Sequence, residues 1–179
     1  MTKPELRKAI RVRLAALTPE AKVEKSAAIC RALAHTQEWR AARTVGFFSP
    51  LDSEPNVDLL WAVLGDRTVC YPRIHGEDLV FIQVPDREAL LESERWNLLE
   101  PPHRDEHVVS PGEMDLCFVP GMAFTADGHR MGRGKGYYDR LLAHPAFRAP
   151  AFGICFAEQL VAHLPMEAHD RPVSGVFSA

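Results

Sequence analysis

The sequence has no excess of basic residues. Lysine and arginine together number 21 against 24 aspartates and glutamates, and the formal net charge at pH 7 is −3. General nucleic-acid-binding proteins carry a basic face that contacts the phosphate backbone. The charge balance therefore argues against that class of protein, although it allows local basic patches.

Long apolar runs are also missing. The longest stretch without a charged residue, Leu116–Ala126, has 11 residues and contains Pro120 and Gly121. About 20 apolar residues are needed to cross a bilayer, so no membrane-spanning helix is predicted. The charged residues and proline at 3–5 do not resemble the apolar core of a signal peptide, which argues against secretion.

Cysteines are few and show no paired spacing. None of the four, Cys30, Cys70, Cys117 and Cys155, belongs to a C-x-x-C motif, and three of them lie in short apolar runs. Buried, reduced thiols are the favoured interpretation. Such thiols are typical of a cytoplasmic protein.

Metal-binding motifs are missing as well. The eight histidines include no H-E-x-x-H motif. His103 and His107 are four residues apart, but they lie in a stretch rich in proline and acidic residues. Solvated side chains are therefore favoured there over a metal-binding pair.

What the sequence does contain is an alternation of helical and strand patterns. Thr2 and Thr18 each precede a proline and a glutamate, as is typical of helix starts, and apolar residues then recur at helical spacing. We expect helices from these two caps to about 17 and 34, and over 36–42, 55–64, 86–92, 137–144 and 158–164. Short apolar runs predict strands over 44–48, 68–71, 79–83, 114–120, 151–156 and 173–178.

This alternation predicts a single α/β domain over residues 1–179. A chain of 179 residues that is 46% apolar can bury its own core. Strands that alternate with helices form a mostly parallel sheet with helices on both faces and right-handed crossovers. Ligands bind such sheets where strands end and loops lead into helices. The stretch 96–113 is expected to be a long surface loop, a kind of segment that is often functional.

A glycine-rich stretch lies between an expected strand and an expected helix. It reads HRMGRGKGYYDRL over 129–141, and Gly128 precedes it. Its glycines permit positive φ angles, so that successive backbone N–H groups can point toward one anion. Arg130, Arg133 and Lys135 add full positive charges. The stretch is therefore expected to bind phosphate.

Spacing alone leaves another interpretation open, a flexible loop with solvated cations. The stretch matches neither G-x-x-x-x-G-K-[ST] nor G-x-G-x-x-G. Tyr137 and Tyr138 favour a ligand site, because one ring can pack inward while the other presents a flat face and a hydroxyl to a planar ligand. Asp139 and Asp170 are candidate ligands for Mg²⁺ beside the phosphates. The alternative role of Asp139 is to compensate a helix dipole.

A second cationic set lies on the first expected helix. Lys3, Arg7 and Arg11 recur every four residues and share one face. A solvated face is the ordinary interpretation, yet like charges at this spacing repel each other. An anion nearby would explain the arrangement.

Four stretches carry a resemblance to a known family. They are VPGMAFTADGHRMGRGKGYYDRLL at 119–142, KPELR at 3–7, FFSPLDSEPNVDLL at 47–60 and LPMEAHDRPV at 164–173. Together they resemble the 5-formyltetrahydrofolate cyclo-ligase family, also called 5,10-methenyltetrahydrofolate synthetase. The likeness extends over nearly the whole chain, and it implies a three-layer, Rossmann-like fold of the NagB/RpiA/CoA-transferase type.

The resemblance implies an ATP-dependent ring closure on a folate. In that family the formyl oxygen of 5-formyltetrahydrofolate attacks the γ-phosphate of ATP in the presence of Mg²⁺. N10 then attacks the activated carbon, and phosphate leaves as the 5,10-methenyl ring forms. Such an enzyme must position two ligands and neutralise phosphate charge.

The resemblance also implies roles for the matching residues. Arg133, Lys135 and Tyr137 would be catalytic, and the two cations would stabilise the transferred phosphoryl group. Asp139 and Asp170 would hold Mg²⁺, while Arg11 is left out of the site. Folate contacts would come from Glu54, Arg133, Gly134, Lys135, Gly136 and Tyr137. ATP contacts would come from Lys3, Arg7, Arg130, Met131, Gly132, Arg133, Gly134, Lys135, Gly136, Tyr137 and Tyr138.

Two other functions stay open at this point. A relative with the same nucleotide loop could act on another small molecule, because fold and phosphate loop do not fix the second substrate. The loop around Glu54, which would contact the folate, distinguishes that alternative from a folate enzyme. The other alternative is a non-catalytic regulator that binds nucleotides or sugar phosphates. The expected metal-binding pair, Asp139 and Asp170, distinguishes such a regulator from an enzyme. The expected partners are ATP and a reduced folate, with no nucleic acid or membrane, and a monomer is expected.

Overall fold

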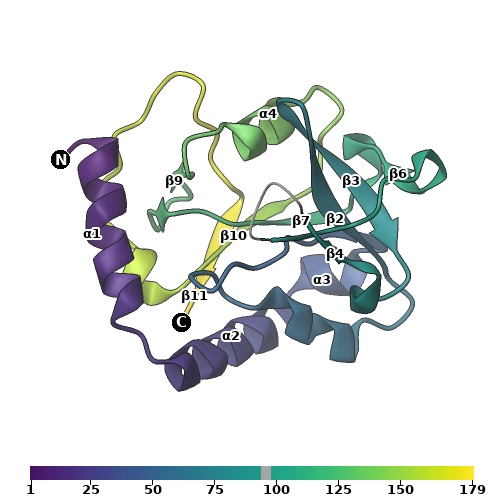
Figure 1. Cartoon of the computed structure of the whole chain (residues 1–179), viewed down its shortest axis with the longest axis horizontal. Helices are drawn as coiled ribbons and strands as arrows, with labels where there is room; N and C mark the ends of the chain where they lie inside the picture. The colour runs from purple at the N-terminus through teal and green to yellow at the C-terminus, as the bar shows by residue number, and fades with distance from the viewer. Residues whose placement is uncertain (94–97) are drawn as a thin grey trace.

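A seven-stranded sheet forms the centre of the computed structural model, which describes residues 1–93 and 98–179 (Figure 1). Its strands are β1 (Thr44–Gly46), β2 (Thr68–His75), β3 (Asp78–Val84), β6 (Val108–Val109), β7 (Leu116–Val119), β10 (Ala151–Cys155) and β11 (Gly175–Ser178). Five neighbours in the order β11, β10, β7, β1 and β2 run parallel. The strands β3 and β6 extend the sheet in antiparallel fashion.

Helices cover both faces of this sheet. In Figure 1, α2 (Pro19–Ala34) and α3 (Gln37–Ala41) lie below it, and α4 (Tyr137–Ala143) lies above it. Successive side chains of a strand point to opposite faces. Along β7, Leu116 and Phe118 therefore pack into the cluster that contains α2 and α3, whereas Cys117 and Val119 pack into the cluster that contains α4. The predicted three-layer α/β class is confirmed.

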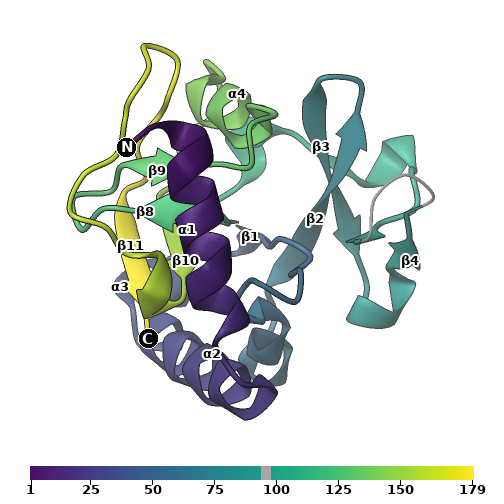
Figure 2. The same cartoon turned by 60° about the vertical axis from the view of Figure 1, so that its left-hand side comes forward.

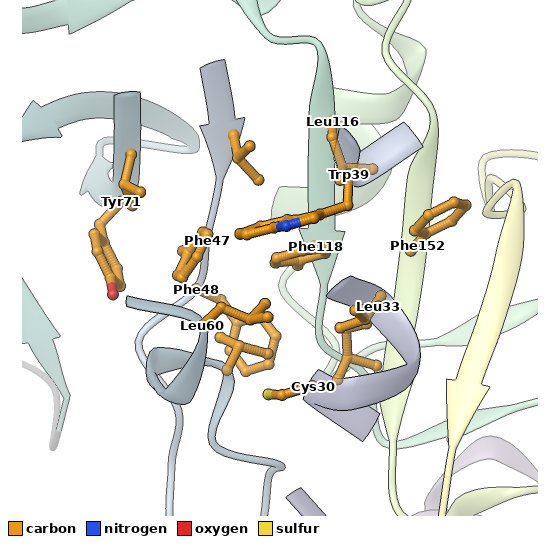
Figure 3. Close-up of a cluster of buried hydrophobic side chains, with 14 of the residues drawn as sticks. Cys30, Leu33, Trp39, Phe47, Phe48, Leu60, Tyr71, Leu116, Phe118 and Phe152 are labelled. Atoms are coloured by element: carbon orange, nitrogen blue, oxygen red, sulfur yellow. The ribbon is translucent and has the colours of Figure 1, made fainter. Parts of the chain in front are cut away.

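Aromatic side chains fill the layer between the sheet and α2 (Figure 3). The Trp39 ring stacks on Phe118 with centroids 6.2 Å apart and planes at 14°, and Phe47 lies 5.3 Å from Phe118. Truncation of such a buried ring, as in Phe118→Ala, costs about 3–5 kcal/mol. This packing holds β1 and β7 side by side, so the loops that leave their carboxyl ends start from fixed positions.

The helix α1 (Lys3–Ala15) lies across a small hairpin of β8 (Ala123–Phe124) and β9 (Arg130–Met131) (Figure 2). Thr2 and Glu5 form the expected capping box at its start. Leu6, Ile10 and Leu14 are buried in a third cluster with residues of this hairpin. This packing brings Arg7 of the helix next to the backbone that follows β9.

Short elements complete the described chain. The expected helix over 55–64 forms as the 3₁₀ helix η1 (Val57–Val63). Of the helix expected over 86–92, only the 3₁₀ turn η2 (Arg87–Ala89) forms, and residues 91 and 92 belong to a strand instead. Of the expected loop 96–113, residues 96 and 97 lie outside the described residues. The remainder contains β5 (Leu99–Glu100), which pairs with β4 (Leu91–Glu92), β6, and the 3₁₀ turns η3 (Asp105–His107) and η4 (Pro111–Glu113).

The helix predicted over 158–164 is wrong. The segment forms only the 3₁₀ turn η5 (Ala157–Gln159). The buried Gln159 amide donates to the carbonyl oxygens of Gly121 and Met122, and the Val161 N–H donates to the carbonyl of Phe124. These bonds to the β8 region compete with the intrahelical bonds that a helix would need, and apolar spacing does not report them.

All four cysteines are free and buried, as expected. Burial raises the pKa of the Cys30, Cys117 and Cys155 thiols to about 12. They are therefore protonated and unreactive near neutral pH. Within residues 1–93 and 98–179, no helix has both the length and the apolar character needed to cross a membrane.

Candidate active site

Residues 132–136 of the glycine-rich stretch form a glycine loop that joins β9 to α4, and the backbone of this loop requires glycine. Gly134 has a φ angle of +106°, and Gly136, the N-cap of α4, has a φ angle of +70°. Side chains disfavour this region. At Gly132 a β-carbon would lie 2.8 Å from Nη1 of Arg130. The glycines thus let the backbone turn tightly between the side chains of Arg7 and Arg130.

Arg130 is a buried cation at the base of this loop. Its Nη2 donates to Oδ1 of Asp139 over 2.7 Å, and only 3% of its side chain is exposed. Nε of Arg130 and the hydroxyl of Tyr138 are buried and have no hydrogen-bond partner among the described residues. Burial also raises the pKa of the Tyr138 hydroxyl well above its ordinary value. Two buried donors of this region are therefore unpaired in the described structure.

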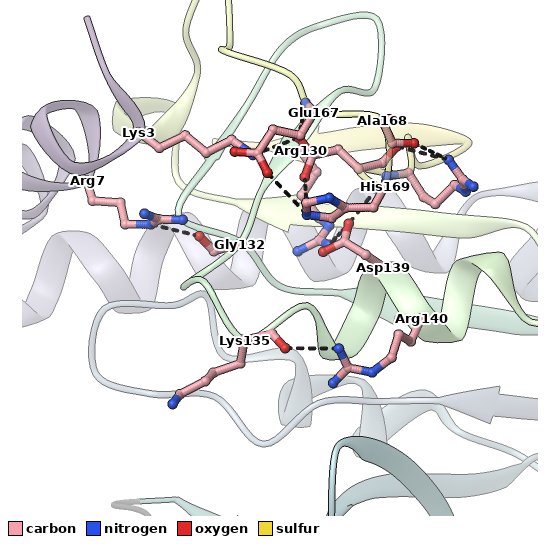
Figure 4. Close-up of polar contacts among 12 residues, drawn as sticks. Lys3, Arg7, Arg130, Gly132, Lys135, Asp139, Arg140, Glu167, Ala168 and His169 are labelled. Carbon is pink, nitrogen blue, oxygen red and sulfur yellow. Dashed lines mark hydrogen bonds and ion pairs between the residues drawn. The ribbon is translucent and has the colours of Figure 1, made fainter.

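Two cations of the N-terminal helix contact residues that are distant in sequence, and one of them, Arg7, reaches the glycine loop (Figure 4). Lys3 Nζ lies 2.8 Å from Oδ2 of Asp170 and 3.1 Å from Oε1 of Glu167. Arg7 Nε donates to the Gly132 carbonyl over 3.1 Å. Burial opposes the charged form of Asp170, but the hydrogen bond and charge of Lys3 outweigh it and lower the Asp170 pKa. The structure thus brings together chain segments that are far apart in sequence.

Arg133 connects the glycine loop to the loop that follows β1. Its Nε and Nη2 donate to Oε1 of Glu54 over 3.2 and 2.8 Å, and Nη2 also donates to Oγ of Ser53 over 3.0 Å. Glu54 is buried, and its Oε2 accepts from the Leu51 N–H. Two residues that the sequence places in one site are therefore in direct contact.

A cavity of about 420 Å³ lies between these two loops. Its lining includes the cationic residues Arg130, Arg133 and Lys135 and apolar residues such as Phe48 and Leu79. Lys135 is exposed, and its ammonium makes no ion pair within the described chain. Such a cavity suits a ligand with an anionic end and a flat apolar body.

Most predicted site residues line this cavity, but not all of them do. Lys3, Arg7, Gly134 and Asp170 lie beside it in the α1 contact region. The Met131 side chain is buried with Leu6 and Ile10, so only its backbone is available to a nucleotide. The predicted site residues that line the cavity are Glu54, Arg130, Gly132, Arg133, Lys135, Gly136, Tyr137, Tyr138 and Asp139.

Comparison with known proteins now identifies the family. The model of the 5-formyltetrahydrofolate cyclo-ligase family matches residues 1–178. The chain belongs to this family. A 5-formyltetrahydrofolate cyclo-ligase of Mus musculus is 31% identical to it, with 96% of this chain and 91% of that protein covered. The corresponding protein of Escherichia coli K12 is 29% identical, with 94% and 96% covered.

A solved structure agrees with this family membership. The 5,10-methenyltetrahydrofolate synthetase of Aquifex aeolicus matches with a TM-score of 0.85 and 29% identity, covering 99% of this chain and 90% of that chain. The resemblance inferred from the four sequence stretches is confirmed.

The site of this family member includes residues that sequence reasoning missed. Phe48 and Pro120 follow β1 and β7 at their carboxyl ends, so the rule that ligands bind there could have found them. Ile74, Leu79 and Glu100 come from the β2–β3 and β4–β5 hairpins. No local sequence pattern marks them as site residues, because their positions depend on how the two hairpins pack beside the cavity.

Asp139 and Asp170, the expected Mg²⁺ ligands, lie on neighbouring segments but form no preformed metal cluster among the described residues. No cluster of three or more acidic, histidine or cysteine side chains suited to a metal occurs in the described parts of the chain. Oδ1 of Asp139 accepts from the backbone N–H of Arg171, which places Asp139 beside the segment that carries Asp170. Mg²⁺ usually takes only one or two protein carboxylates together with phosphate oxygens and water. Both carboxylates are engaged with cations in this structure.

Proposed function

We propose that this protein converts 5-formyltetrahydrofolate and ATP into 5,10-methenyltetrahydrofolate, ADP and phosphate. The observation that carries the proposal is family membership over residues 1–178. The cavity supports it, since cations of the glycine loop and several apolar residues line the same space. The nucleotide phosphates would lie along the loop, and the pterin would lie against the apolar residues.

The reaction is a phosphoryl transfer followed by ring closure. The formyl oxygen attacks the γ-phosphorus of ATP, and the bond to ADP breaks. N10 then attacks the formyl carbon and loses its proton, and the carbon–oxygen bond breaks as phosphate leaves with the former formyl oxygen. Phosphorylation is needed because an amide-like formyl group is a poor electrophile with a poor leaving group.

The cations of the loop would stabilise the charge that moves in the first step. Lys135 is free to meet the γ-phosphate, and Arg133 can reach it after exchanging its contact with Glu54 for the ligand. Fixed charges in a water-poor cavity act strongly on a transferring phosphoryl group. Lys3 and Arg7 would add phosphate contacts from α1, with Arg130 and the backbone around Gly132, Gly134 and Gly136.

Glu54 and Tyr137 would position the folate. Glu54 lies at the cavity wall next to Arg133, so it can accept hydrogen bonds from folate N–H groups close to the transferred phosphate. Tyr137 offers an aromatic face at the end of the loop. Binding both reactants side by side makes the reaction effectively unimolecular, which lowers the entropic part of the activation barrier.

Asp139 and Asp170 would hold the magnesium ion, whose chemistry is to neutralise phosphate charge and orient the oxygens. Their present partners, Arg130 and Lys3, are themselves proposed to bind the nucleotide. These cations can therefore exchange a carboxylate for a phosphate when nucleotide and metal bind together.

We also propose that the enzyme acts as a cytosolic monomer. The buried, free thiols suit a reducing compartment. A sedimentation mass near 20.0 kDa is expected. A stable dimer at working concentration would contradict the monomer.

The activity is tested by mixing the purified protein with MgATP and 5-formyltetrahydrofolate. We expect the near-ultraviolet absorbance of methenyltetrahydrofolate to rise and ADP to form in equal amount. No methenyl product, with ADP formed on another formylated molecule, would contradict the folate assignment.

A further inference from the structure

Arg140 connects the glycine loop with the tip of the β2–β3 hairpin. It lies on α4, just after the loop ends, and the hairpin packs beside this helix (Figure 1). Its Nη1 donates to the Lys135 carbonyl over 3.2 Å, and its Nη2 donates to the Glu77 carbonyl. Its Nε donates to Oδ1 of Asp78 over 3.2 Å. One guanidinium thus holds the loop against a segment 63 residues earlier in the chain than Arg140 itself.

The Arg140 side chain lies directly against the loop. A β-carbon at Gly136 would lie only 2.9 Å from Nη1 of Arg140. The Cζ atom of Arg140 lies 5.3 Å from the centroid of the Tyr137 ring, which is within the range of a cation–π contact. Arg140 therefore contacts both the backbone of Lys135 and the ring that is proposed to position the folate.

The bonds to the two carbonyls matter more than the ion pair with Asp78. The side chains of Arg140 and Asp78 are 41% and 70% exposed, and exposed ion pairs contribute little. The two carbonyls belong to the backbone, and a planar guanidinium can donate to both of them at once in a fixed geometry. A lysine ammonium would keep the charge but lacks this planar fork.

The Arg140 contact need not change when the nucleotide binds. Arg7 holds the Gly132 carbonyl and Arg133 holds Glu54, but both of these cations are proposed to turn to the phosphates. Arg140 lies outside the cavity lining. Figure 4 shows the Lys135 side chain extending away from Arg140. The carbonyl bond thus restrains the backbone of Lys135 and leaves its ammonium free to act in the cavity.

We propose that Arg140 is a positioning residue that clamps the glycine loop to the β2–β3 hairpin and thereby places Lys135 for phosphoryl transfer. The effect on catalysis rests on the proposed function. Misplacement of a catalytic group by about 1 Å can cost on the order of a hundredfold in rate. Without the clamp we expect a loss of about tenfold, because the loop keeps its connections to β9 and α4.

The first test measures release of the loop without measuring turnover. Trypsin cleaves after Arg133 and Lys135, and cleavage of a native chain requires local opening. Arg140→Gln should speed cleavage at these two sites about tenfold, detected by mass spectrometry. Cleavage after Arg31, on α2, should keep its rate. Unchanged cleavage in the loop, or an equal rise at every site, would overturn the clamp.

The second test is steady-state kinetics of the same variants. Arg140→Gln should lower kcat about tenfold and change the KM for ATP by no more than about twofold, because Lys135 acts mainly in the transition state. Arg140→Lys should lose nearly as much, since it cannot bond both carbonyls. Full activity of Arg140→Lys, or unchanged kcat in Arg140→Gln, would overturn the positioning role.

Three matched controls separate the carbonyl bonds from charge. Glu77→Gln and Asp78→Asn leave the backbone carbonyls in place, and Arg31→Gln removes an exposed helical arginine far from the cavity lining. All three should keep kcat near the wild-type value. A loss in Asp78→Asn equal to that in Arg140→Gln would assign the effect to the ion pair and contradict the clamp.

The failure of this inference can be told apart from failure of the proposed function. Faster cleavage of the loop in Arg140→Gln, in a protein that does not turn over 5-formyltetrahydrofolate, would support the clamp and contradict the proposed activity. Normal turnover with unchanged cleavage would do the reverse.

Discussion

Lys135 is the cation of the glycine loop on which the proposed chemistry depends most. It is exposed and makes no ion pair in the described structure, so it contributes little to folding. We expect Lys135→Ala to lower kcat about a hundredfold, as loss of one charge-stabilising group does, and to leave Tm nearly unchanged.

The comparison is made by steady-state kinetics and thermal unfolding of the same preparations. Lys8→Ala is the control, because Lys8 is an exposed lysine of α1 outside the cavity. A parallel loss of Tm and activity in the Lys135 variant would show that the side chain supports the fold.

Asp139 is predicted to act in two ways. As the partner of the buried Arg130 it stabilises the fold, and as a proposed metal ligand it binds Mg²⁺. Asp139→Asn should therefore lower Tm and raise the Mg²⁺ concentration that gives half-maximal activity. Asp66→Asn, at an exposed acid outside the site, is the control. An unchanged magnesium titration with a lowered Tm would restrict Asp139 to positioning Arg130.

The ion pair of Lys3 and Asp170 makes a defined contribution to pH dependence. The pKa of Asp170 is lowered below its ordinary value of 3.8, and the pKa of Lys3 is raised above 10.5 because its hydrogen bonds to Asp170 and Glu167 outweigh the opposing effect of burial. The contribution of the pair is therefore present at neutral pH. It is lost as pH falls through the lowered pKa of Asp170 or rises through the raised pKa of Lys3.

The expected measurement is the difference in Tm between wild type and Lys3→Gln. It should be constant between about pH 5 and pH 9 and shrink below about pH 4. Lys8→Gln should show no such dependence. A difference that grows at acid pH would contradict the assignment of this pair.

At the level of elements, the turn before α4 depends on a conformation that only glycine adopts easily. Gly134 has a φ angle of +106° beside the Arg7 guanidinium. Alanine there is strained by about 1–3 kcal/mol, and the loop would relax away from the nucleotide. We expect Gly134→Ala to raise the KM for ATP about tenfold or more.

Gly65→Ala is the matched control, because Gly65 also has a positive φ angle, +62°, and lies outside the cavity. Both variants should lose similar stability by thermal unfolding, but only Gly134→Ala should lose ATP affinity. Equal KM values for ATP in the two variants would remove Gly134 from the nucleotide site.

The helices also differ in how well local sequence patterns predict them. The capping box at Thr2 and the apolar stripe of α1 are local signals, and they predicted the helix correctly. The segment after Gln159 has a similar apolar content, yet it bonds to the β8 region instead of forming a helix. That outcome depends on a partner more than 30 residues away in sequence, which no local pattern contains.

At the level of the whole molecule, the alternation of strands and helices was enough to predict the layers and the mostly parallel sheet. It did not predict that β2 and β3 form a hairpin, or that Ile74, Leu79 and Glu100 line the cavity. The contacts of α1 with the C-terminal segment around Asp170 were likewise implied only by resemblance. Such long-range contacts arise from the packing of α1 on β8 and β9.

The central claim is that ATP activates the formyl oxygen within the cavity between the glycine loop and the loop after β1. The direct measurement uses 5-formyltetrahydrofolate whose formyl oxygen is replaced by a heavy isotope, with unlabelled MgATP and water. Mass spectrometry of the released phosphate should find one labelled oxygen per phosphate formed, with none in ADP. Methenyl product accompanied by unlabelled phosphate would contradict the account.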